Sequence, residues 1–453
     1  MGNKVAGSEG NACRRMGVGA SRFSKRWRRK KPLRFDKLVI KLLNKFPPSY
    51  YCSLHKTGVE MRMFVSVRSL PLLILSLAAL MPVLIPVHES RAQTSVTTNP
   101  VGYVQLSCSA SSDTVVSVPF TQPTAYAGLV ASISGSTVTV SGAPGWTANQ
   151  FAVGSGTNTY YALLTSGTTV SPRDGATYTV AASSSNTLTL ELNGDTISGV
   201  PSGSNISIIA YWTLNTVFPA SNAGISFTAS AGSTARTRAT QILFPDTVDA
   251  GTNLPPGYVS ETNTYYIFYF YNSAWRLAGG DSTVDVGNTP IPVNSYIIVR
   301  NAGSPSTLTA MGSVALNNTT MPLLTDSNQL QDNAVSLPRP VDVSLNNLGL
   351  ITSNAFTPST GSTARTRADQ LLIPDNTIPG TNNPVPSPGT YTTYATGTFY
   401  YYNGAWRLAG GDSTVDCGNA LIHAGTGFTI RKVQTSNGGT VLWENTPTYT
   451  NTQ

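Results

Sequence analysis

The sequence predicts an all-β protein, and composition, strand-like periodicity and turn signals together lead to this fold class. After residue 92 the chain is dominated by Ser, Thr, Gly, Asn, Val and Tyr, a composition that favours strands and turns over helices. Amphipathic helix patterns are not evident after residue 93, whereas polar and apolar residues alternate between Gly-containing turns. We expect an N-terminal β domain followed by two duplicated β-sandwich-like modules, mostly antiparallel.

The basic character of the chain is confined to its first 92 residues. They hold 18 Lys and Arg against 4 Asp and Glu, a net charge of +14. Residues 93–453 hold 11 against 17, a net charge of −6, and Lys432 is their only lysine. Because no basic stripe is available there to bind a polyanion, the sequence argues against nucleic acid as a partner.

Residues 61–92 have the order of a secretory signal peptide. A short cationic stretch, Met61–Arg68, precedes the apolar run Leu70–Val87, and small residues, Ser90 and Ala92, end the segment. We therefore expect cleavage after Ala92, export to the periplasm, the outer surface or the extracellular space, and no membrane span after cleavage. The alternative is an uncleaved membrane anchor, because the apolar run is about long enough to cross a bilayer.

Residues 1–60 form a basic leader upstream of this signal. Arg26-Trp-Arg-Arg-Lys-Lys31 has the composition of a nucleic-acid-binding patch, but a patch removed with the signal cannot serve the exported domain. We interpret residues 1–60 as an over-extended gene model whose true start is Met61 or Met63. An unusually long leader is the alternative.

Residues 94–221 are predicted to form a separate N-terminal β domain. Gly128–Gly142 alternates around Gly135-Ser136 and predicts a hairpin, and Asn186–Asp195 predicts a strand that ends in an Asn-Gly turn.

Two blocks of sequence then occur twice. Gly232-Ser-Thr-Ala-Arg-Thr-Arg-Ala239 recurs at 361–368, and Ala274-Trp-Arg-Leu-Ala-Gly-Gly-Asp-Ser-Thr-Val-Asp285 recurs at 405–416. The offset between the copies is slightly longer at the second block than at the first, so the copies differ by a short length change between the blocks. We therefore predict a repeat module at 222–322, a connector at 323–352 and a second module at 353–452.

Each module is expected to contain an aromatic strand, a two-residue turn and a return strand with Trp and Arg. Tyr265–Tyr271 precedes the Asn272-Ser273 turn in the first copy, and Thr398–Tyr402 precedes Asn403-Gly404 in the second. Tyr296–Arg300 and its counterpart Gly427–Arg431 predict a further strand.

Several segments, in order along nearly the whole mature chain, resemble an uncharacterised exported all-β family found mainly in verrucomicrobial bacteria. The segments are Asn99–Tyr103, Ser111–Pro119, Gly145–Gln150, Leu190–Asp195, Tyr211–Pro219 and the Tyr-Tyr-Asn-Gly-Ala-Trp-Arg block at 401–407. That family has no assigned activity, so the resemblance implies export and supplies no catalytic or ligand residues. Its members usually carry one Trp-Arg module, and the second copy in this chain is a departure.

Trp275 with Arg276, and Trp406 with Arg407, are the candidate ligand-binding residues. Adjacent strand positions point to opposite faces, so one side chain of each pair points inward. In one interpretation Trp anchors the core and Arg pairs with Asp281 or Asp412. In the other, Trp faces outward and forms a flat aromatic surface suited to sugar rings.

Two further arginine pairs have period-two spacing. Arg236 with Arg238, and Arg365 with Arg367, predict a solvated strand edge on which both arginines share a face.

Asp281 with Asp285, and Asp412 with Asp416, are the carboxylate pairs that both copies keep. The preceding glycine pairs, 279–280 and 410–411, suggest a turn that the first Asp caps, with the second Asp exposed. A Ca²⁺ site built from these oxygens is the alternative, although the spacing matches no twelve-residue calcium loop. No other cofactor is expected.

Cys108 and Cys417 are the two cysteines of the mature chain. Export would permit a disulfide between them, but Cys417 aligns with Val286 of the first copy and so suggests an apolar packing position instead.

Catalytic constellations are sparse. His423 is the only histidine after residue 92, and its first-copy counterpart is Pro292, so neither an imidazole metal site nor a Ser-His-Asp triad is expected. We predict a non-catalytic, exported structural or interaction protein. The sequence does not identify its partner, and a glycan or a cell-envelope component is the candidate. The alternatives are a carbohydrate-binding protein that uses exposed aromatics of the modules, and a glycosidase that uses the paired carboxylates.

Overall fold

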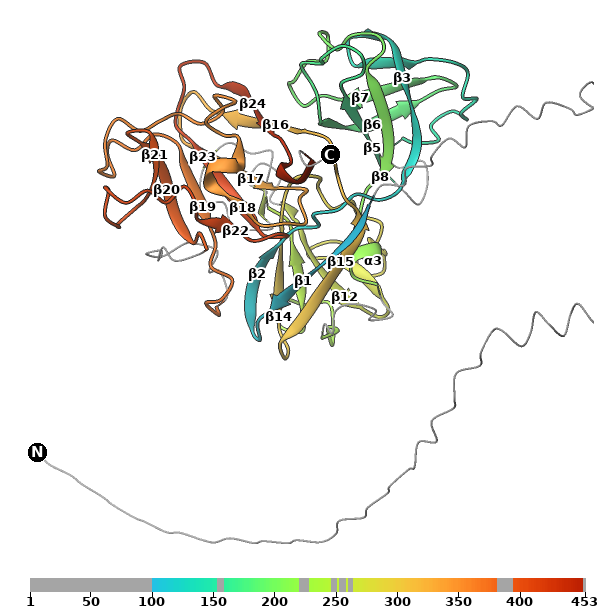
Figure 1. Ribbon diagram of the computed structural model, residues 1–453. Coiled ribbons are helices and arrows are strands. Elements are labelled where there is room, and N and C mark those ends of the chain that lie inside the picture. The colour runs from blue at the N-terminus through green and yellow to red at the C-terminus, as the bar shows by residue number, and fades with distance from the viewer. Residues whose placement is uncertain are drawn as a thin grey trace, which may run out of the picture. The chain divides into compact units, whose positions relative to one another are not determined.

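The computed structural model describes residues 100–152, 159–219, 228–245, 251, 258–259, 264–380 and 394–450 (Figure 1). Strands dominate this part of the chain, and its helical elements are short: α3 (Leu214–Val217), η2 (Leu345–Leu348) and η3 (Thr448–Thr450). The strands pair antiparallel, except where β16 (Thr319–Thr325) meets β6 (Ala176–Ser183). The all-β prediction is confirmed, whereas the predicted leader and signal peptide, residues 1–92, lie outside the described residues.

Six strands of the predicted N-terminal domain close into a barrel. Their order is β6-β5-β8-β3-β4-β7, and β7 pairs back onto β6. Closure gives each strand a partner on both sides and so removes exposed edges. The strands are β3 (Thr124–Ser134), β4 (Thr137–Val140), β5 (Tyr160–Thr165), β6 (Ala176–Ser183), β7 (Thr187–Glu191) and β8 (Asn205–Ala210).

The local predictions for this barrel are confirmed. β3 and β4 form the hairpin around Gly135-Ser136, with Ser134 opposite Thr137. After β7, Asn193 and Gly194 both have positive φ, 46° and 86°, as a tight Asn-Gly turn requires. Inward-facing residues such as Val130, Leu164 and Leu188 fill the barrel core.

A five-stranded sheet contains the first repeated segment, and a two-stranded ribbon packs with it in a shared core that includes Trp275, Ile242 and Leu308. The sheet order is β13-β12-β9-β14-β2, from β13 (Ala274–Leu277), β12 (Ile267–Tyr271), β9 (Gln241–Leu243), β14 (Ile297–Asn301) and β2 (Ser112–Val116). The ribbon pairs β1 (Val101–Cys108) with β15 (Ser306–Ser313), and a short pair joins β10 (Tyr258–Val259) to β11 (Thr264–Tyr265).

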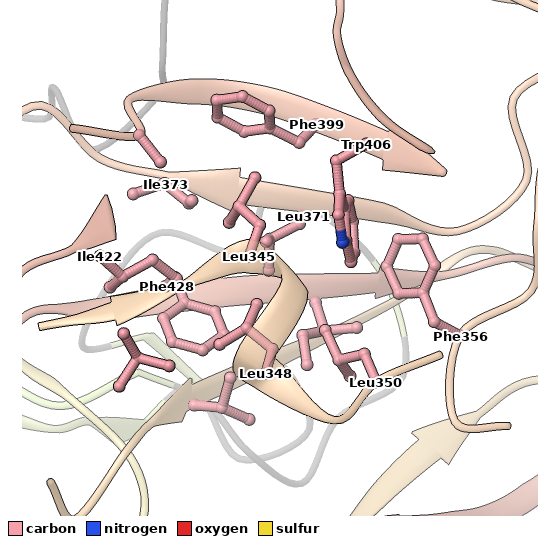
Figure 2. Close-up of a cluster of buried hydrophobic side chains, with 14 of the residues drawn as sticks. Leu345, Leu348, Leu350, Phe356, Leu371, Ile373, Phe399, Trp406, Ile422 and Phe428 are labelled. Carbon is pink, nitrogen blue, oxygen red and sulfur yellow. The ribbon is translucent and has the colours of Figure 1, made fainter. Parts of the chain in front are cut away.

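A second five-stranded sheet contains the second repeated segment. Its order is β21-β20-β19-β23-β17, from β21 (Ala405–Leu408), β20 (Gly397–Tyr402), β19 (Gln370–Ile373), β23 (Gly427–Lys432) and β17 (Gln331–Ser336). Its ribbon pairs β16 (Thr319–Thr325) with β24 (Gly439–Asn445), and β18 (Val343–Ser344) pairs with β22 (Leu421–Ile422). Figure 2 shows the core of this sandwich, in which the Trp406 indole points in beside Phe356, with η2 crossing the cluster.

The two sheets have the same strand order once the repeat offset is applied. β13, β12, β9 and β14 take the places of β21, β20, β19 and β23. The fifth strands, β2 and β17, lie outside the two repeated blocks, yet each presents an Asp to the equivalent Arg across the strand pair: Asp113 to Arg300, and Asp332 to Arg431.

The sheets therefore do not follow the predicted domain boundaries. β1 and β2 belong to the first sandwich rather than to the domain predicted at 94–221, so the barrel interrupts that sandwich in the sequence. β17 lies in the predicted connector 323–352 but completes the second sheet. Alternating patterns identify strands without identifying their partners, and pairing between segments so far apart in the sequence leaves no local signal.

A buried ion pair distinguishes the second sandwich from the first. Lys432 is 3% exposed and contacts Asp369, which is fully buried and accepts backbone N–H groups from Thr357 and Val433. At the equivalent positions the first sandwich has Asn301 and Thr240, and the Thr240 hydroxyl accepts from the equivalent N–H groups. The first copy therefore connects these two segments through the neutral Thr240, and the second copy connects the equivalent segments through the charged Asp369.

We predict that Lys432→Met lowers the free energy of unfolding by about 3–5 kcal/mol, because it leaves the Asp369 carboxylate buried without its cation. The double variant Lys432→Asn with Asp369→Thr installs the first-copy residues and should recover most of that loss. Urea unfolding measures both, and a double variant as unstable as Lys432→Met would contradict the prediction.

Candidate functional site

The two tryptophans predicted as ligand-binding residues are buried. Trp275 is 0% and Trp406 1% exposed, and each ring meets the aromatic residue opposite it in the hairpin, Phe270 or Tyr401, edge-on at 5.5 Å. The Trp275 Nε1–H also donates to the Phe218 carbonyl at 3.2 Å. The interpretation in which Trp anchors the core is therefore confirmed, and the alternative of an exposed aromatic surface is wrong: these indoles form the cores of the two sandwiches and cannot stack on a sugar ring.

The adjacent arginines lie on the opposite sheet face and are also buried, Arg276 to 6% and Arg407 to 7% exposure. Arg276 donates to the Tyr271 carbonyl at 3.4 Å, and Arg407 to the Thr414 carbonyl at 2.7 Å. The expected pairing with Asp281 or Asp412 is therefore replaced by hydrogen bonds to the backbone.

The Arg-Thr-Arg segments cover this same face. Arg238 stacks on the Tyr269 ring with 5.0 Å between guanidinium carbon and centroid, and Arg367 stacks on Tyr400 at 4.8 Å. Tyr269 lies directly opposite Arg276 in the strand pair. The predicted strand edge is instead a turn, in which Thr237 N–H donates to the Thr234 carbonyl, and it joins the two repeated blocks into one packed unit.

The paired carboxylates shape turns. Asp281 Oδ1 accepts the N–H and hydroxyl of Thr283, both at 2.8 Å, and Asp412 accepts the same groups of Thr414. The Thr283 backbone N–H, with its hydroxyl and the charge of Arg276, lowers the pKa of Asp281. This is the turn-capping interpretation of the sequence.

The second carboxylates have an equally local role. Asp285 accepts the Gly287 N–H at 2.9 Å, and Asp416 accepts the Gly418 N–H at 2.8 Å. The described residues contain no group of three His, Cys, Asp or Glu side chains arranged to hold a metal ion. The geometry therefore supports turn formation and gives no support to the Ca²⁺ alternative.

Cys108 and Cys417 are free and buried, so the disulfide alternative was wrong. They lie in different cores, Cys108 in the first sandwich and Cys417 in the second. The Cys417 N–H donates to the Trp406 carbonyl, and the Val286 N–H donates to the Trp275 carbonyl in the same way. The thiol of Cys417 therefore takes the place of the Val286 isopropyl group. Burial raises the pKa of Cys108 to about 11 and also raises the pKa of Cys417.

A cavity of about 50 Å³, here called the junction cavity, lies where the barrel, the first sandwich and the end of β17 meet. Aromatic and aliphatic side chains form most of its wall, Asn294 and Asn317 add amides, and all of its lining residues are uncharged: Val118, Phe120, Thr121, Tyr161, Leu163, Gly175, Thr177, Trp212, Ile291, Pro292, Val293, Asn294, Ser295, Ala315, Asn317, Thr319, Ser336 and Pro338.

The second sandwich has an equivalent cavity of about 10 Å³, here called the second cavity. Arg339 lines the second cavity at the position equivalent to Phe120, which lines the junction cavity. In the same way, His423 lines the second cavity at the position of Pro292. Arg339 is 2% exposed and donates to the side chain and carbonyl of Asn445 at 3.2 and 3.1 Å, while its Nη1 has no hydrogen-bond partner among the residues that the structure describes. Burial lowers the pKa of Arg339.

His423 belongs to the surface beside this second cavity. Its ring stacks on Tyr394 with 3.6 Å between centroids, and its Nδ1 lies 3.6 Å from Asp342. The Asp342 carboxylate also accepts the Ala424 N–H at 2.9 Å, so it orders the chain beside the histidine.

Asp113 and Asp332 are structurally important residues that the sequence reasoning missed. The signal was present as a third, weaker similarity, Ser112-Asp-Thr-Val-Val-Ser-Val-Pro119 against Gln331-Asp-Asn-Ala-Val-Ser-Leu-Pro338. The offset between these two segments is much longer than the offset of either repeated block, so they lie outside the period that the blocks define.

Comparisons with known proteins add no relative: no family model, curated protein or solved structure matches this chain. No helix in the described part of the chain has both the length and the apolar character of a membrane span.

We predict that Trp275→Ala and Trp406→Ala each lower the free energy of unfolding by about 3–5 kcal/mol, because each leaves a large cavity in a sandwich core. Tyr103→Ala is the control, since Tyr103 is 69% exposed and its loss should cost less than about 0.5 kcal/mol. Equilibrium unfolding followed by tryptophan fluorescence or circular dichroism measures the difference, and indole variants as stable as the control would refute it.

Thiol chemistry provides a further prediction. Because both thiols are buried and their pKa values are raised, Cys108 and Cys417 of the folded protein should react slowly with a thiol reagent at pH 8. In denaturant both should react promptly, without prior reduction. A requirement for reductant would indicate a disulfide and contradict the free thiols.

Proposed function

We propose that the protein is an exported, non-catalytic structural or interaction protein that works at the cell surface or outside the cell, where its partner is a glycan or another component of the envelope. One observation carries the non-catalytic part of the proposal. The residues that both copies keep, Trp, Arg, the glycine pair and two Asp, serve packing and turn hydrogen bonds within the molecule.

An active site would place such retained groups differently. A glycosidase needs one carboxylic acid and one carboxylate that face a shared cleft. In this chain Asp281 and Asp412 accept hydrogen bonds within their own turns, and Asp285 and Asp416 accept from the glycine two residues on. Because these carboxylates accept hydrogen bonds from backbone N–H groups of their own turns, they support a scaffold role.

Export rests on the signal-like segment 61–92 and on the resemblance to exported verrucomicrobial proteins. The composition of the mature chain supports it, since few charges and many Ser, Thr and Asn residues suit a β-rich extracellular protein.

The exposed aromatic surface that the carbohydrate-binding alternative requires is absent at Trp275 and Trp406. It required the Trp275 and Trp406 rings to face solvent, and both are buried. The proposal therefore places recognition elsewhere on the modules rather than on these indoles.

We predict that the secreted protein begins at Gln93. Ala92→Arg should block processing, because the residue before the cleavage site must be small, and the precursor should accumulate. Ala79→Leu, a substitution within the apolar run, is the matched control and should be processed normally. N-terminal sequencing of the exported protein, together with cell fractionation, measures both variants, and a mature protein found in the cytoplasm would contradict export.

The non-catalytic part has a separate test. The purified mature chain should not hydrolyse glycoside substrates, and Asp281→Asn with Asp412→Asn should leave binding to envelope material unchanged. Turnover that this double variant abolishes would overturn the proposal.

A further inference from the structure

The two sandwiches contact each other through a set of hydrogen bonds that occurs twice. Asp113 N–H, on edge strand β2 of the first sheet, donates to the Gly380 carbonyl of the second copy at 2.9 Å. Asp332 N–H, on the equivalent strand β17, donates to the Gly251 carbonyl of the first copy at 3.0 Å. Gly251 and Gly380 are equivalent positions, related by the same offset as the first repeated block.

The same reciprocity holds for the glycine N–H groups. Gly380 N–H donates to Ser112 Oγ at 2.9 Å, and Gly251 N–H donates to Gln331 Oε1 at 3.0 Å. Ser112 and Gln331 each precede the edge-strand Asp, so the side-chain type differs while the contact is retained.

A further reciprocal pair lies at the other end of the edge strands. Ser117 N–H donates to the Gly425 carbonyl at 2.7 Å, and Ser336 N–H donates to the Asn294 carbonyl at 2.8 Å. Gly425 and Asn294 are equivalent positions, related by the same offset as the second repeated block.

Between these contacts, one position meets its own equivalent. Tyr296 aligns with Gly427, and a Cβ added to Gly427 would overlap the Tyr296 Cβ. The Tyr296 hydroxyl reaches Thr429 Oγ1 at 3.2 Å. A residue lies against its own equivalent only beside a two-fold axis, and glycine in one copy leaves room for tyrosine in the other.

Reciprocal contacts distinguish this arrangement from copies stacked in one direction. In a head-to-tail array, a position in copy one contacts copy two, and the reverse contact is absent. Here the three contacts described above, at the edge-strand Asp, at Gly251 or Gly380 and at Ser117 or Ser336, each have their reverse, as in the isologous interface of a C2 dimer.

We infer that each sandwich is a self-complementary module: the surface formed by its edge strand, by Gly251 or Gly380 and by residue 296 or 427 is built to bind a second copy of the module. The chain is then a pair of such modules joined covalently in the arrangement of a homodimer. Mutual binding also covers the edge strands β2 and β17, which would otherwise present unpaired backbone groups to other chains.

Exchange of the residues at the axis tests this inference in the full mature chain. Tyr296→Gly should lower the melting temperature by about 3 °C or more, because it removes a ring from the interface. Adding Gly427→Phe places a ring at the equivalent position of the other copy, where two-fold symmetry provides the matching space. Phenylalanine suits this position because a ring at residue 427 would meet Ile298, the apolar equivalent of Thr429, whose hydroxyl forms a hydrogen bond with the Tyr296 hydroxyl. The double variant should recover at least half of the lost melting temperature.

The matched control is Tyr296→Gly with Gly427→Thr, which adds a strand-favouring side chain without a ring. A phenylalanine variant that melts no higher than this control, or no higher than Tyr296→Gly alone, would overturn the inference. Gly427→Phe alone should clash with Tyr296 and melt lowest or fail to fold. If it fails to fold, a soluble and cooperatively melting double variant still supports the inference, and an unfolded double variant refutes it.

Discussion

The architecture of this chain depends on how the edges of its two five-stranded sheets are completed. A bidentate ion pair joins each edge strand to its neighbour. Arg300 donates to both carboxylate oxygens of Asp113 at 2.8 and 2.9 Å, and Arg431 donates to both of Asp332 at 2.7 and 2.8 Å. Paired N–H groups of a guanidinium match both carboxylate oxygens, so the contact fixes which residues lie opposite one another as well as attracting the strands. In the first sandwich this pair also joins segments on either side of the barrel, so the barrel enters the chain between two strands that remain neighbours.

The residues that the two copies share form a scaffold in which both faces of the Trp-Arg hairpin are buried. Trp275 and Trp406 fill the inner face, while Arg276 and Arg407 lie on the outer face beneath the Arg-Thr-Arg turn. Because both faces are covered, a retained surface-type residue such as Arg becomes a packing residue. Retention in both copies therefore reflects the requirements of the fold, and it does not by itself mark a binding site.

Where the copies differ, they keep the contact and change the chemistry. Thr240 and Asp369 accept equivalent backbone N–H groups, but only the carboxylate requires the buried Lys432. The cavities show the same freedom: Phe120 lines the larger cavity, and Arg339 the equivalent smaller one. The backbone frame of the module thus tolerates an apolar or a charged side chain at positions of equal burial, provided that polar groups find backbone partners.

The sequence by itself determined the all-β class, the hairpins at Gly135 and Asn272, the turn role of Asp281 and the equivalence of Val286 with Cys417. These features depend on neighbours within a few residues, where alternation, Asn-Gly turns and internal repetition leave a readable signal. Only the tertiary structure decided that β2 and β17 complete the two sheets, that the thiols lie in separate cores and that both faces of the Trp-Arg strand are buried. A strand pattern specifies which side chains share a face, but it does not specify what covers that face. Pairing between segments as far apart as Asp113 and Arg300 is set by packing of the whole chain.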